Sequence, residues 1–173
     1  RALLSVLSIT EYRFYDSLAL LAHYPMVNPS EQQESLEKVT TNQHKMQLWA
    51  GHAPMNFQHK YDLVEAEKAR VLGQLEAIDG YEKAIRGARE NGYLQDEALA
   101  YELAAEFYLG RGMEKIAQTY LREAHYGYQQ WGAMAKVEDL EERYPQLLIA
   151  TRSPQTTNPL RTFVRDSVAI LSD

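Results

Sequence analysis

Residues 77–92 read AIDGYEKAIRGARENG, and residues 117–132 read AQTYLREAHYGYQQWG. The two stretches agree at four positions that lie forty residues apart: two alanines, one large side chain between them and a closing glycine. In order, Ala77, Tyr81, Ala84 and Gly92 correspond to Ala117, Leu121, Ala124 and Gly132. A fixed period of this size is typical of one supersecondary unit that has been copied and stacked. The repeat therefore predicts a solenoid, whose usual function is surface recognition rather than catalysis.

The composition is that of an ordinary folded protein. The chain has 173 residues, of which 45% are hydrophobic and 24% charged, and it contains no cysteine. The lack of cysteine excludes disulfide scaffolds and thiol catalysis, and no apolar run reaches the roughly 18–20 residues of a membrane span. The net charge of −6 argues against non-specific binding to nucleic acid or anionic membranes. We therefore expect a cytoplasmic protein, and its start at Arg1 indicates a fragment of a longer chain.

Apolar residues recur at three- and four-residue steps along most of the chain, which is the period of an α-helix. No segment shows the alternating pattern of a strand. Glycine and proline residues divide the helical pattern into paired segments. Residues 1–148 are therefore predicted to form one repeat domain with helical hairpins at about 2–50, 57–91 and 95–130 and a capping helix at 133–143.

Local signals predict where several helices begin and end. We expect Ser30 to cap the second helix, with Gln33 completing a capping box. Gly92 and Gly132 are predicted to end the fourth and sixth helices. The Asp-Gly pair at residues 79–80 resembles a turn, but the repeat alignment places it inside a helix, where a glycine costs about 1 kcal/mol relative to alanine.

The C-terminal region has a different composition. Residues 149–159 are rich in Thr, Ser and Pro and are predicted to form a linker. Residues 160–173 are predicted to contain a short amphipathic helix. This helix either leads into a following domain or packs back on the repeats.

The helical pattern resembles the tetratricopeptide repeat (TPR). The residues that match its first helix are Leu103, Ala104 and Phe107. Those that match its second helix are Ala117, either Tyr120 or Leu121, and Ala124. The resemblance implies an all-α fold in which antiparallel helix hairpins stack as a TPR-like right-handed solenoid. The forty-residue period exceeds the TPR period of about 34 residues, so longer helices are expected.

A second resemblance covers roughly residues 10–148. It is carried by YDSLALLA at 15–22, HAPMN at 52–56, ENGY at 90–93, WGAMAKVEDLE at 131–141 and RYPQLL at 143–148. These motifs resemble the helical-repeat segment of large bacterial multi-sensor signalling kinases. In that family a Ser/Thr kinase domain and an ATPase module precede the repeats, and a GAF sensor and often a histidine kinase follow. The resemblance implies that the parent chain is an ATP-dependent protein kinase.

The fragment itself lacks the usual catalytic motifs. It has no GxxxxGK[ST] phosphate loop, no GxGxxG turn, no HExxH helix and no kinase signature. His52 and His59 are seven residues apart, but a zinc site needs three or four converging ligands. We therefore predict no catalytic residue, no cofactor and no metal site in this fragment.

Tyrosine is unusually frequent, with twelve residues against four phenylalanines. The TPR register implies that a set of first-helix residues faces a concave binding groove, and the candidates are Tyr15, Gln58, Tyr61, Glu65, Lys68, Tyr101 and Tyr108. The same register adds Ala98 and Ala105, and it places three of the tyrosines in a row along the inner wall. Tyrosine suits recognition because it combines a large apolar ring with a polar tip. The alternative, which we favour for helices of this length, is that the rings pack as spacers between successive first helices.

These observations favour a non-catalytic protein-interaction and regulatory module within a signal-transduction kinase. Its concave helical surface would bind a neighbouring domain or another protein, and we expect neither nucleic acid nor membrane as a partner. Two alternatives remain: a sensor for a small ligand or peptide, and a self-association module that forms a homo-oligomer of the parent.

The repeat alignment can be tested by overpacking. Ala124→Leu adds bulk where two helices are predicted to touch, so we expect the free energy of unfolding in urea to fall by about 1–3 kcal/mol. Ala117→Leu should behave in the same way. Stability equal to that of the parent fragment would contradict the alignment.

Overall fold

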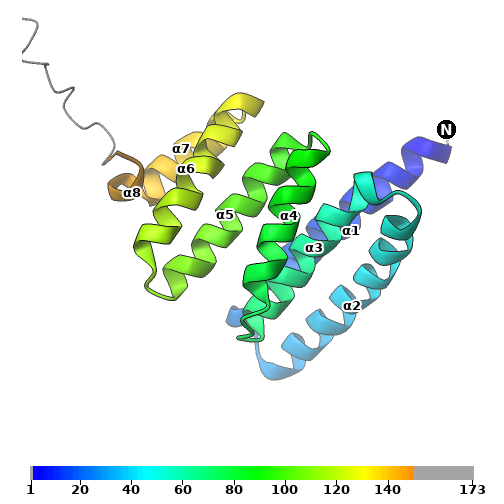
Figure 1. The fold of residues 1–173 in the computed structure, drawn as a ribbon. Helices are drawn as coiled ribbons and strands as arrows, with labels where there is room; N and C mark the ends of the chain where they lie inside the picture. The colour runs from blue at the N-terminus through cyan, green and yellow to red at the C-terminus, as the bar shows by residue number, and fades with distance from the viewer. Residues whose placement is uncertain (1, 150–173) are drawn as a thin grey trace, which may run out of the picture.

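The described part of the molecule consists of helices and the loops that join them. A computed structural model describes the backbone of residues 2–149 and the side chains of residues 9–148. This part contains eight α-helices and no strand, which confirms the predicted all-α class (Figure 1). The predicted linker, except for Ile149, and the predicted helix at 160–173 lie outside the described residues.

The helices follow one another through short connections. They are α1 (Ala2–His23), α2 (Pro29–His52), α3 (Pro54–Val71), α4 (Ala77–Glu90), α5 (Leu94–Gly110), α6 (Glu114–Trp131), α7 (Met134–Arg143) and α8 (Pro145–Ile149), with a 3-10 turn (Tyr24–Met26) between α1 and α2.

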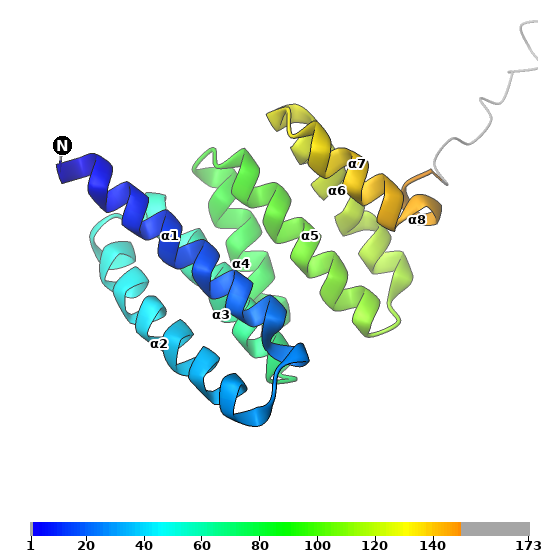
Figure 2. The same cartoon turned by 180° about the vertical axis from the view of Figure 1, so that it is seen from behind.

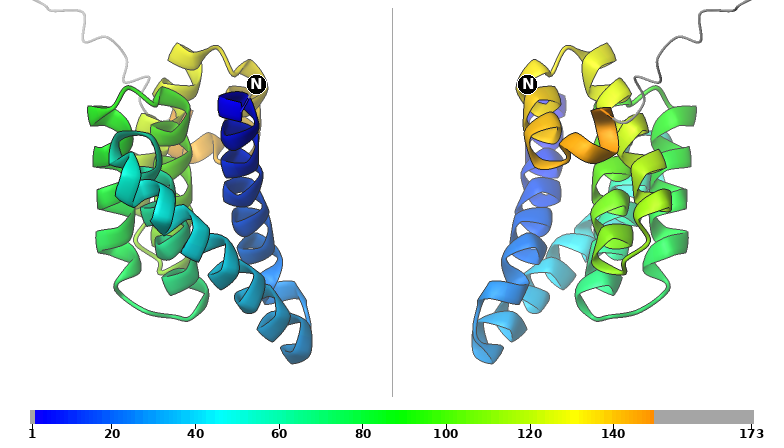
Figure 3. Two further views of the ribbon diagram at one scale, coloured as in Figure 1. Left: turned by 90° about the vertical axis from the view of Figure 1, so that its right-hand side faces the viewer. Right: turned by 90° about the vertical axis from the view of Figure 1, so that its left-hand side faces the viewer.

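Neighbouring helices pack in a helical-repeat arrangement. The most extensive contacts join α3 with α4 and α5 with α6, while α3 also contacts both α1 and α5. In Figure 1 α4 and α6 lie toward the viewer, and Figure 2 shows α1, α5 and α7 from the opposite side. Helix α2 runs obliquely between α1 and the α3–α4 hairpin (Figure 3). The two sides of the stack therefore expose different helices.

The start of α2 differs from the prediction. Asn28, rather than Ser30, is the N-cap: its side-chain oxygen accepts the backbone N–H groups of Ser30 and Glu31 at 3.0 and 3.1 Å. Glu31, rather than Gln33, completes the capping box by accepting the Asn28 N–H at 3.2 Å. Pro29 explains the shift, because proline fits the first helical position, where its missing N–H needs no partner.

Proline also begins two other helices at positions that differ from the prediction. Pro54 begins α3, about three residues before the predicted start at residue 57. Pro145 begins the short helix α8 at a point where the sequence predicted that helical structure ends. In both cases proline acts as a helix-starting residue rather than a helix breaker.

Glycine ends the second helix of the α3–α4 hairpin and of the α5–α6 hairpin, as predicted. Gly92 and Gly132 have φ values of 76° and 82°, in the left-handed region that glycine adopts without steric cost. The next N–H in the chain then bonds back to the helix, from Tyr93 to the Ala88 carbonyl and from Ala133 to the Tyr128 carbonyl, both at 2.9 Å. These bonds satisfy carbonyl groups that the helix end leaves unpaired.

The predicted small residues lie at close contacts between paired helices. The four repeat alanines, Ala77, Ala84, Ala117 and Ala124, are buried together with Tyr81 and Leu121. Residues 79–80 lie inside α4, as the repeat alignment predicted. A Cβ added to Gly80 would lie 2.8 Å from the Cβ of Ala66, so the two helices approach to a distance that glycine alone permits.

The close contacts also correct the register of the first helices. A Cβ on Gly87 of α4 would lie 3.2 Å from His59, and one on Gly127 of α6 would lie 2.9 Å from Ala98. The two glycines are forty residues apart, whereas His59 and Ala98 are thirty-nine apart. Tyr101 therefore corresponds in space to Asp62 rather than to Tyr61. The predicted row of tyrosines, which treats Tyr61 and Tyr101 as equivalent, was therefore wrong by one residue, because contact with the second helix sets the position of each first helix.

A buried ionic cluster joins α1, α3 and α5, the first helices of the three hairpins. Lys60 of α3 is 2% exposed, and its Nζ lies 2.7 Å from Oδ2 of Asp96 in α5 and 3.0 Å from Glu11 in α1. His59 Nε2 lies 2.8 Å from the same Asp96 oxygen. Because a buried charge without its partner is strongly destabilising, this cluster favours one relative placement of α1, α3 and α5.

Among the described residues, no helix has both the length and the apolar character that crossing a bilayer requires.

Two glycine substitutions test the helix contact. Gly80→Ala should lower the free energy of unfolding by about 1–3 kcal/mol, because the new methyl group overlaps Ala66. Gly110→Ala is the control: no atom lies within 4 Å of its added Cβ, so we expect unchanged stability or a gain of up to about 1 kcal/mol. Equal urea midpoints for the two variants would refute the close approach of α3 and α4.

Candidate functional site

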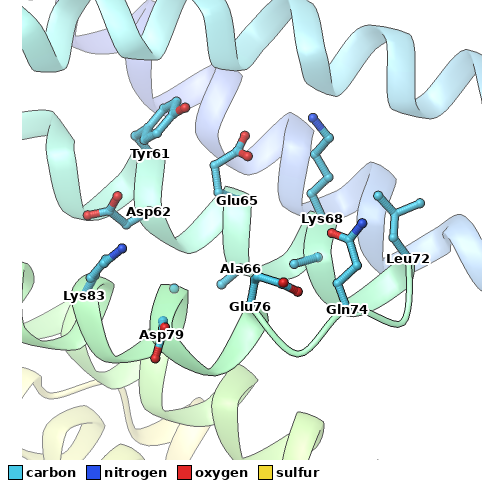
Figure 4. Close-up of a pocket in the computed structure, with 12 residues that line it drawn as sticks. Tyr61, Asp62, Glu65, Ala66, Lys68, Leu72, Gln74, Glu76, Asp79 and Lys83 are labelled. Atoms are coloured by element: carbon cyan, nitrogen blue, oxygen red, sulfur yellow. The ribbon is translucent and has the colours of Figure 1, made fainter.

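A hollow of about 580 Å³ lies over α3, between α2 and α4. In Figure 4 α2 passes on one side of the hollow, and α4 forms the other side. The lining residues come from α3, α4 and the loop between them: Tyr61, Asp62, Glu65, Ala66, Lys68, Ala69, Leu72, Gln74, Glu76, Asp79, Gly80 and Lys83. The hollow thus belongs mainly to a single hairpin.

The spacing of residues on α3 builds one wall of this hollow. Tyr61, Glu65, Lys68 and Leu72 follow one another at four- and three-residue steps, which places them along one face of the helix. Between α3 and α4 the lining residues are small, and Gly80 carries no side chain that could enter the space. The hollow therefore exists because long polar side chains surround a strip of small residues.

The next hairpin fills the corresponding position with aromatic rings. Tyr120 of α6 lies forty residues after Gly80. Its ring centroid is 5.7 Å from that of Tyr101 and 5.1 Å from that of Tyr108, and its hydroxyl donates to Glu82 of α4. The two hairpins thus differ at this repeat position: Tyr120 covers the space between the helices of the third hairpin, whereas Gly80 has no side chain that could do so in the second.

Charged groups of both signs line the hollow. The carboxylates are Asp62, Glu65, Glu76 and Asp79, and the ammonium groups are Lys68 and Lys83. In the part of the chain that the structure describes, none of these six side chains lies within ion-pair distance of an opposite charge. Their charges are therefore available to a ligand.

Neutral amide groups hold two of the carboxylates in place. Gln58 Nε2 donates to Asp62 Oδ1 at 2.9 Å. Gln43 of α2, which is 4% exposed, donates to Glu65 Oε1 at 2.9 Å and to the Tyr61 carbonyl at 3.0 Å. These bonds orient the acids without neutralising them.

The local environment disfavours additional negative charge. Burial raises the pKa of the Asp62 carboxyl, despite the Gln58 hydrogen bond and the nearby charge of Lys83. Burial and then the carboxylates of Glu65 and Asp62 raise the pKa of the Tyr61 phenol. Both shifts have the direction expected where a negative charge is poorly solvated and close to other negative charges.

The structure brings only part of the predicted groove together. Tyr61, Glu65 and Lys68 line the hollow, and Gln58 reaches it through its bond to Asp62. Tyr15 is 49% exposed and packs its ring against Phe14 on α1.

The remaining predicted groove residues lie in the third hairpin, which consists of α5 and α6. Tyr101 packs against Tyr120 and hydrogen-bonds with Arg89, and Tyr108 is only 8% exposed between rings. Ala98 and Ala105 are fully buried, so their predicted position in a groove was wrong. They face the interior because α5 turns this side toward α6.

Several lining residues were missed because they lie on α4 and its preceding loop. Asp79 and Lys83 belong to the second helix of the hairpin and Glu76 to the loop before it, whereas the TPR register directed attention to first helices. The contrast between Gly80 and Tyr120 in the repeat alignment was the available signal. It marks one position where a large side chain is replaced by none.

The two spaced histidines do not form a site. His59 is buried beside Asp96, while His52 is exposed at the end of α2. Among the described residues, no group of three or more His, Asp or Glu side chains could hold a metal ion.

Comparisons with known proteins agree with a repeat segment. The family model described as CHK1-like TPR repeats matches residues 4–109. Over 76 residues, 44% of this chain, the sequence is 37% identical to "Hybrid signal transduction histidine kinase G" of Dictyostelium discoideum. The aligned segment covers 2% of that much longer relative. No solved structure matches the chain.

The position of Asp62 predicts a pH-dependent cost. The folded state binds the Asp62 proton more tightly than the unfolded chain, so ionisation destabilises the fold as pH rises through the raised pKa. Asp62→Asn, which can still accept the Gln58 bond, should raise the free energy of unfolding at pH 7 by up to about 0.5 kcal/mol.

This gain should vanish below the pKa of the unfolded chain, where both states are protonated. Glu90→Gln, at an exposed position on the same hairpin, is the control and should show no such gain. A loss of stability in Asp62→Asn at pH 7 would contradict the argument.

Proposed function

The chain belongs to the CHK1-like TPR-repeat family, and from this membership we propose that it is a non-catalytic protein-interaction module of a signal-transduction kinase. The name of the Dictyostelium relative supports the kinase context. The motif resemblance to multi-sensor kinases supports a parent chain with a Ser/Thr kinase domain, an ATPase module, a GAF sensor and a histidine kinase. In this arrangement the repeats would bind a neighbouring domain or another protein.

The observation that carries this proposal is the hollow over α3, with six charged side chains that have no ionic partner among the residues that the structure describes. Charged groups of this kind contribute more to specificity and to the rate of encounter than to the stability of a domain. The presence of these charged side chains around a strip of small residues is therefore better explained by recognition than by folding. We propose that this hollow, rather than a continuous row of tyrosines, is the main contact surface.

The lining also favours a protein segment over a small metabolite. Pockets for small molecules are mostly apolar, with a few polar groups that fix the orientation of the ligand. Here Tyr61 and Leu72 are the large apolar contributions, and charged groups are half of the lining. A protein segment can satisfy such a surface with several side chains and its own backbone.

Site-specific crosslinking tests the proposal in the full parent kinase. A photoreactive amino acid replaces Leu72, which is 43% exposed in the hollow, and the control replaces Gln130, which is exposed on α6. We expect the Leu72 variant to crosslink to one protein segment, identified by mass spectrometry, and the Gln130 variant not to label that segment. Equal labelling from both positions would contradict a binding role for the hollow.

A thermal-shift screen addresses the sensor alternative. A metabolite that binds the folded module would raise its melting temperature in proportion to occupancy. We expect no such rise for the isolated repeats. A metabolite that raises the melting temperature and blocks the Leu72 crosslink would favour the sensor.

A further inference from the structure

The hollow has a charge pattern that selects one kind of side chain. Resting on the proposed function, we propose that it holds the arginine or lysine side chain of a protein segment, between the carboxylates of Asp62 and Glu65 and beside the ring of Tyr61. The pairing of Lys68 or Lys83 with an acidic group of the same segment would be secondary.

The balance of charge supports a cationic occupant. Four carboxylates and two ammonium groups line the hollow, and the carboxylates come from both helices. In Figure 4 Asp62 and Glu65 lie on α3, and Glu76 and Asp79 lie on the opposite side of the space. Because carboxylates outnumber the ammonium groups of Lys68 and Lys83, the balance of charge in the lining favours a cation over an anion.

The hydrogen bonds of the two α3 carboxylates support the same conclusion. The bonds that hold Asp62 and Glu65 come from the neutral amides of Gln58 and Gln43. Each carboxylate has a second oxygen, Asp62 Oδ2 and Glu65 Oε2, to which no described side chain donates a bond. Hydrogen bonds from an arginine or lysine to an ionised carboxylate are about twice as strong as those between neutral groups. The raised pKa of Asp62 indicates a carboxylate that a bound cation would stabilise.

An aromatic wall beside these acids suits a cationic group. A lysine or guanidinium group over an aromatic face is attracted by the ring electrons. The described residues already include several such contacts: in the two shortest, Lys60 Nζ lies 4.7 Å from the Phe14 ring centre, and Arg111 Cζ lies 4.7 Å from that of Phe107. In Figure 4 the Tyr61 side chain lies at the edge of the hollow, and its ring is partly buried against the hydrophobic core, which fixes its position.

A comparison with the third hairpin explains why we place the binding site on the second. There Tyr120 packs against Tyr101 and Tyr108 and gives its hydroxyl to Glu82, so an internal side chain already occupies the space and the acid. In the second hairpin Gly80 lies directly against Ala66, so no large side chain of α4 covers the strip of small residues. Among the described residues the lining acids have no ionic partner. An incoming side chain would supply there what Tyr120 supplies in the next unit.

The test uses two peptides that differ only in charge. Acetyl-Gly-Ser-Arg-Ser-Gly-amide and its citrulline counterpart are titrated into the ¹⁵N-labelled chain at low salt and followed by NMR. We expect the arginine peptide to shift the backbone amides of residues 61–69 and 76–83 and to bind about tenfold more tightly than the citrulline peptide. Added salt should weaken the arginine peptide alone.

Protein variants locate the charge that is responsible. Asp62→Asn and Glu65→Gln should each weaken the arginine peptide by about threefold or more, and both keep an oxygen that accepts the existing amide bond. Glu90→Gln removes the same charge at an exposed position outside the hollow and should leave binding unchanged. The NMR spectrum of each variant verifies that it is folded.

Three results would overturn the inference. They are equal binding of the two peptides at the hollow, unchanged arginine binding in both variants, and arginine-dependent shifts confined to other surfaces. The first would leave the Leu72 crosslink, and hence the proposed protein-binding role, intact. Failure of both the peptide titration and the Leu72 crosslink would reject the two proposals together.

Discussion

The close approach of paired helices through glycine and alanine is the constraint on which the rest of this structure depends. Gly80 against Ala66 and Gly127 against Ala98 leave no room for an additional methyl group. Glycine in a helix costs about 1 kcal/mol relative to alanine, so it is tolerated here for the contact that it permits. Once two helices touch at these points, their relative rotation and sliding are restricted. The surrounding side chains then have defined neighbours, and the buried alanines of the repeat become an interior.

Buried polar groups further restrict how the helices are placed relative to one another. Lys60 and Asp96 connect the first helices across hairpins, and Glu102 of α5 accepts bonds from Tyr128 of α6 at 2.6 Å and from Arg143 of α7 at 2.6 Å. Burial, and then the neighbouring Glu102, raise the pKa of Tyr128, so its phenol remains a hydrogen-bond donor. Because these groups are costly to bury alone, they disfavour every arrangement in which a partner is displaced. Apolar contacts supply most of the stability, and the ionic contacts specify the order of the stack.

The functional proposals follow from a difference between copies of one unit. In a repeat protein each unit needs its neighbours for stability, so a surface position can change while the packing pattern is kept. The second and third hairpins share their buried alanines, yet one has Gly80 where the other has Tyr120. In the third hairpin the ring of Tyr120 packs against Tyr101 and Tyr108 and fills the space between the two helices. In the second hairpin the glycine lies against Ala66 and extends no side chain over the neighbouring hollow, whose charged lining suits a partner from outside.

The sequence alone determined the helical class, the hairpin order, the residues buried at the helix contacts and the glycine ends of two helices, because these depend on local periodicity and on backbone conformations that few residues adopt. It also placed Tyr61, Glu65 and Lys68 on one face of a helix. Only the tertiary structure decided which neighbour that face meets. The one-residue slip that pairs Tyr101 with Asp62 and the acids that α4 adds to the hollow arise from contact between helices. A local pattern cannot specify such contacts, because their register is set by how closely two helices approach across the hairpin.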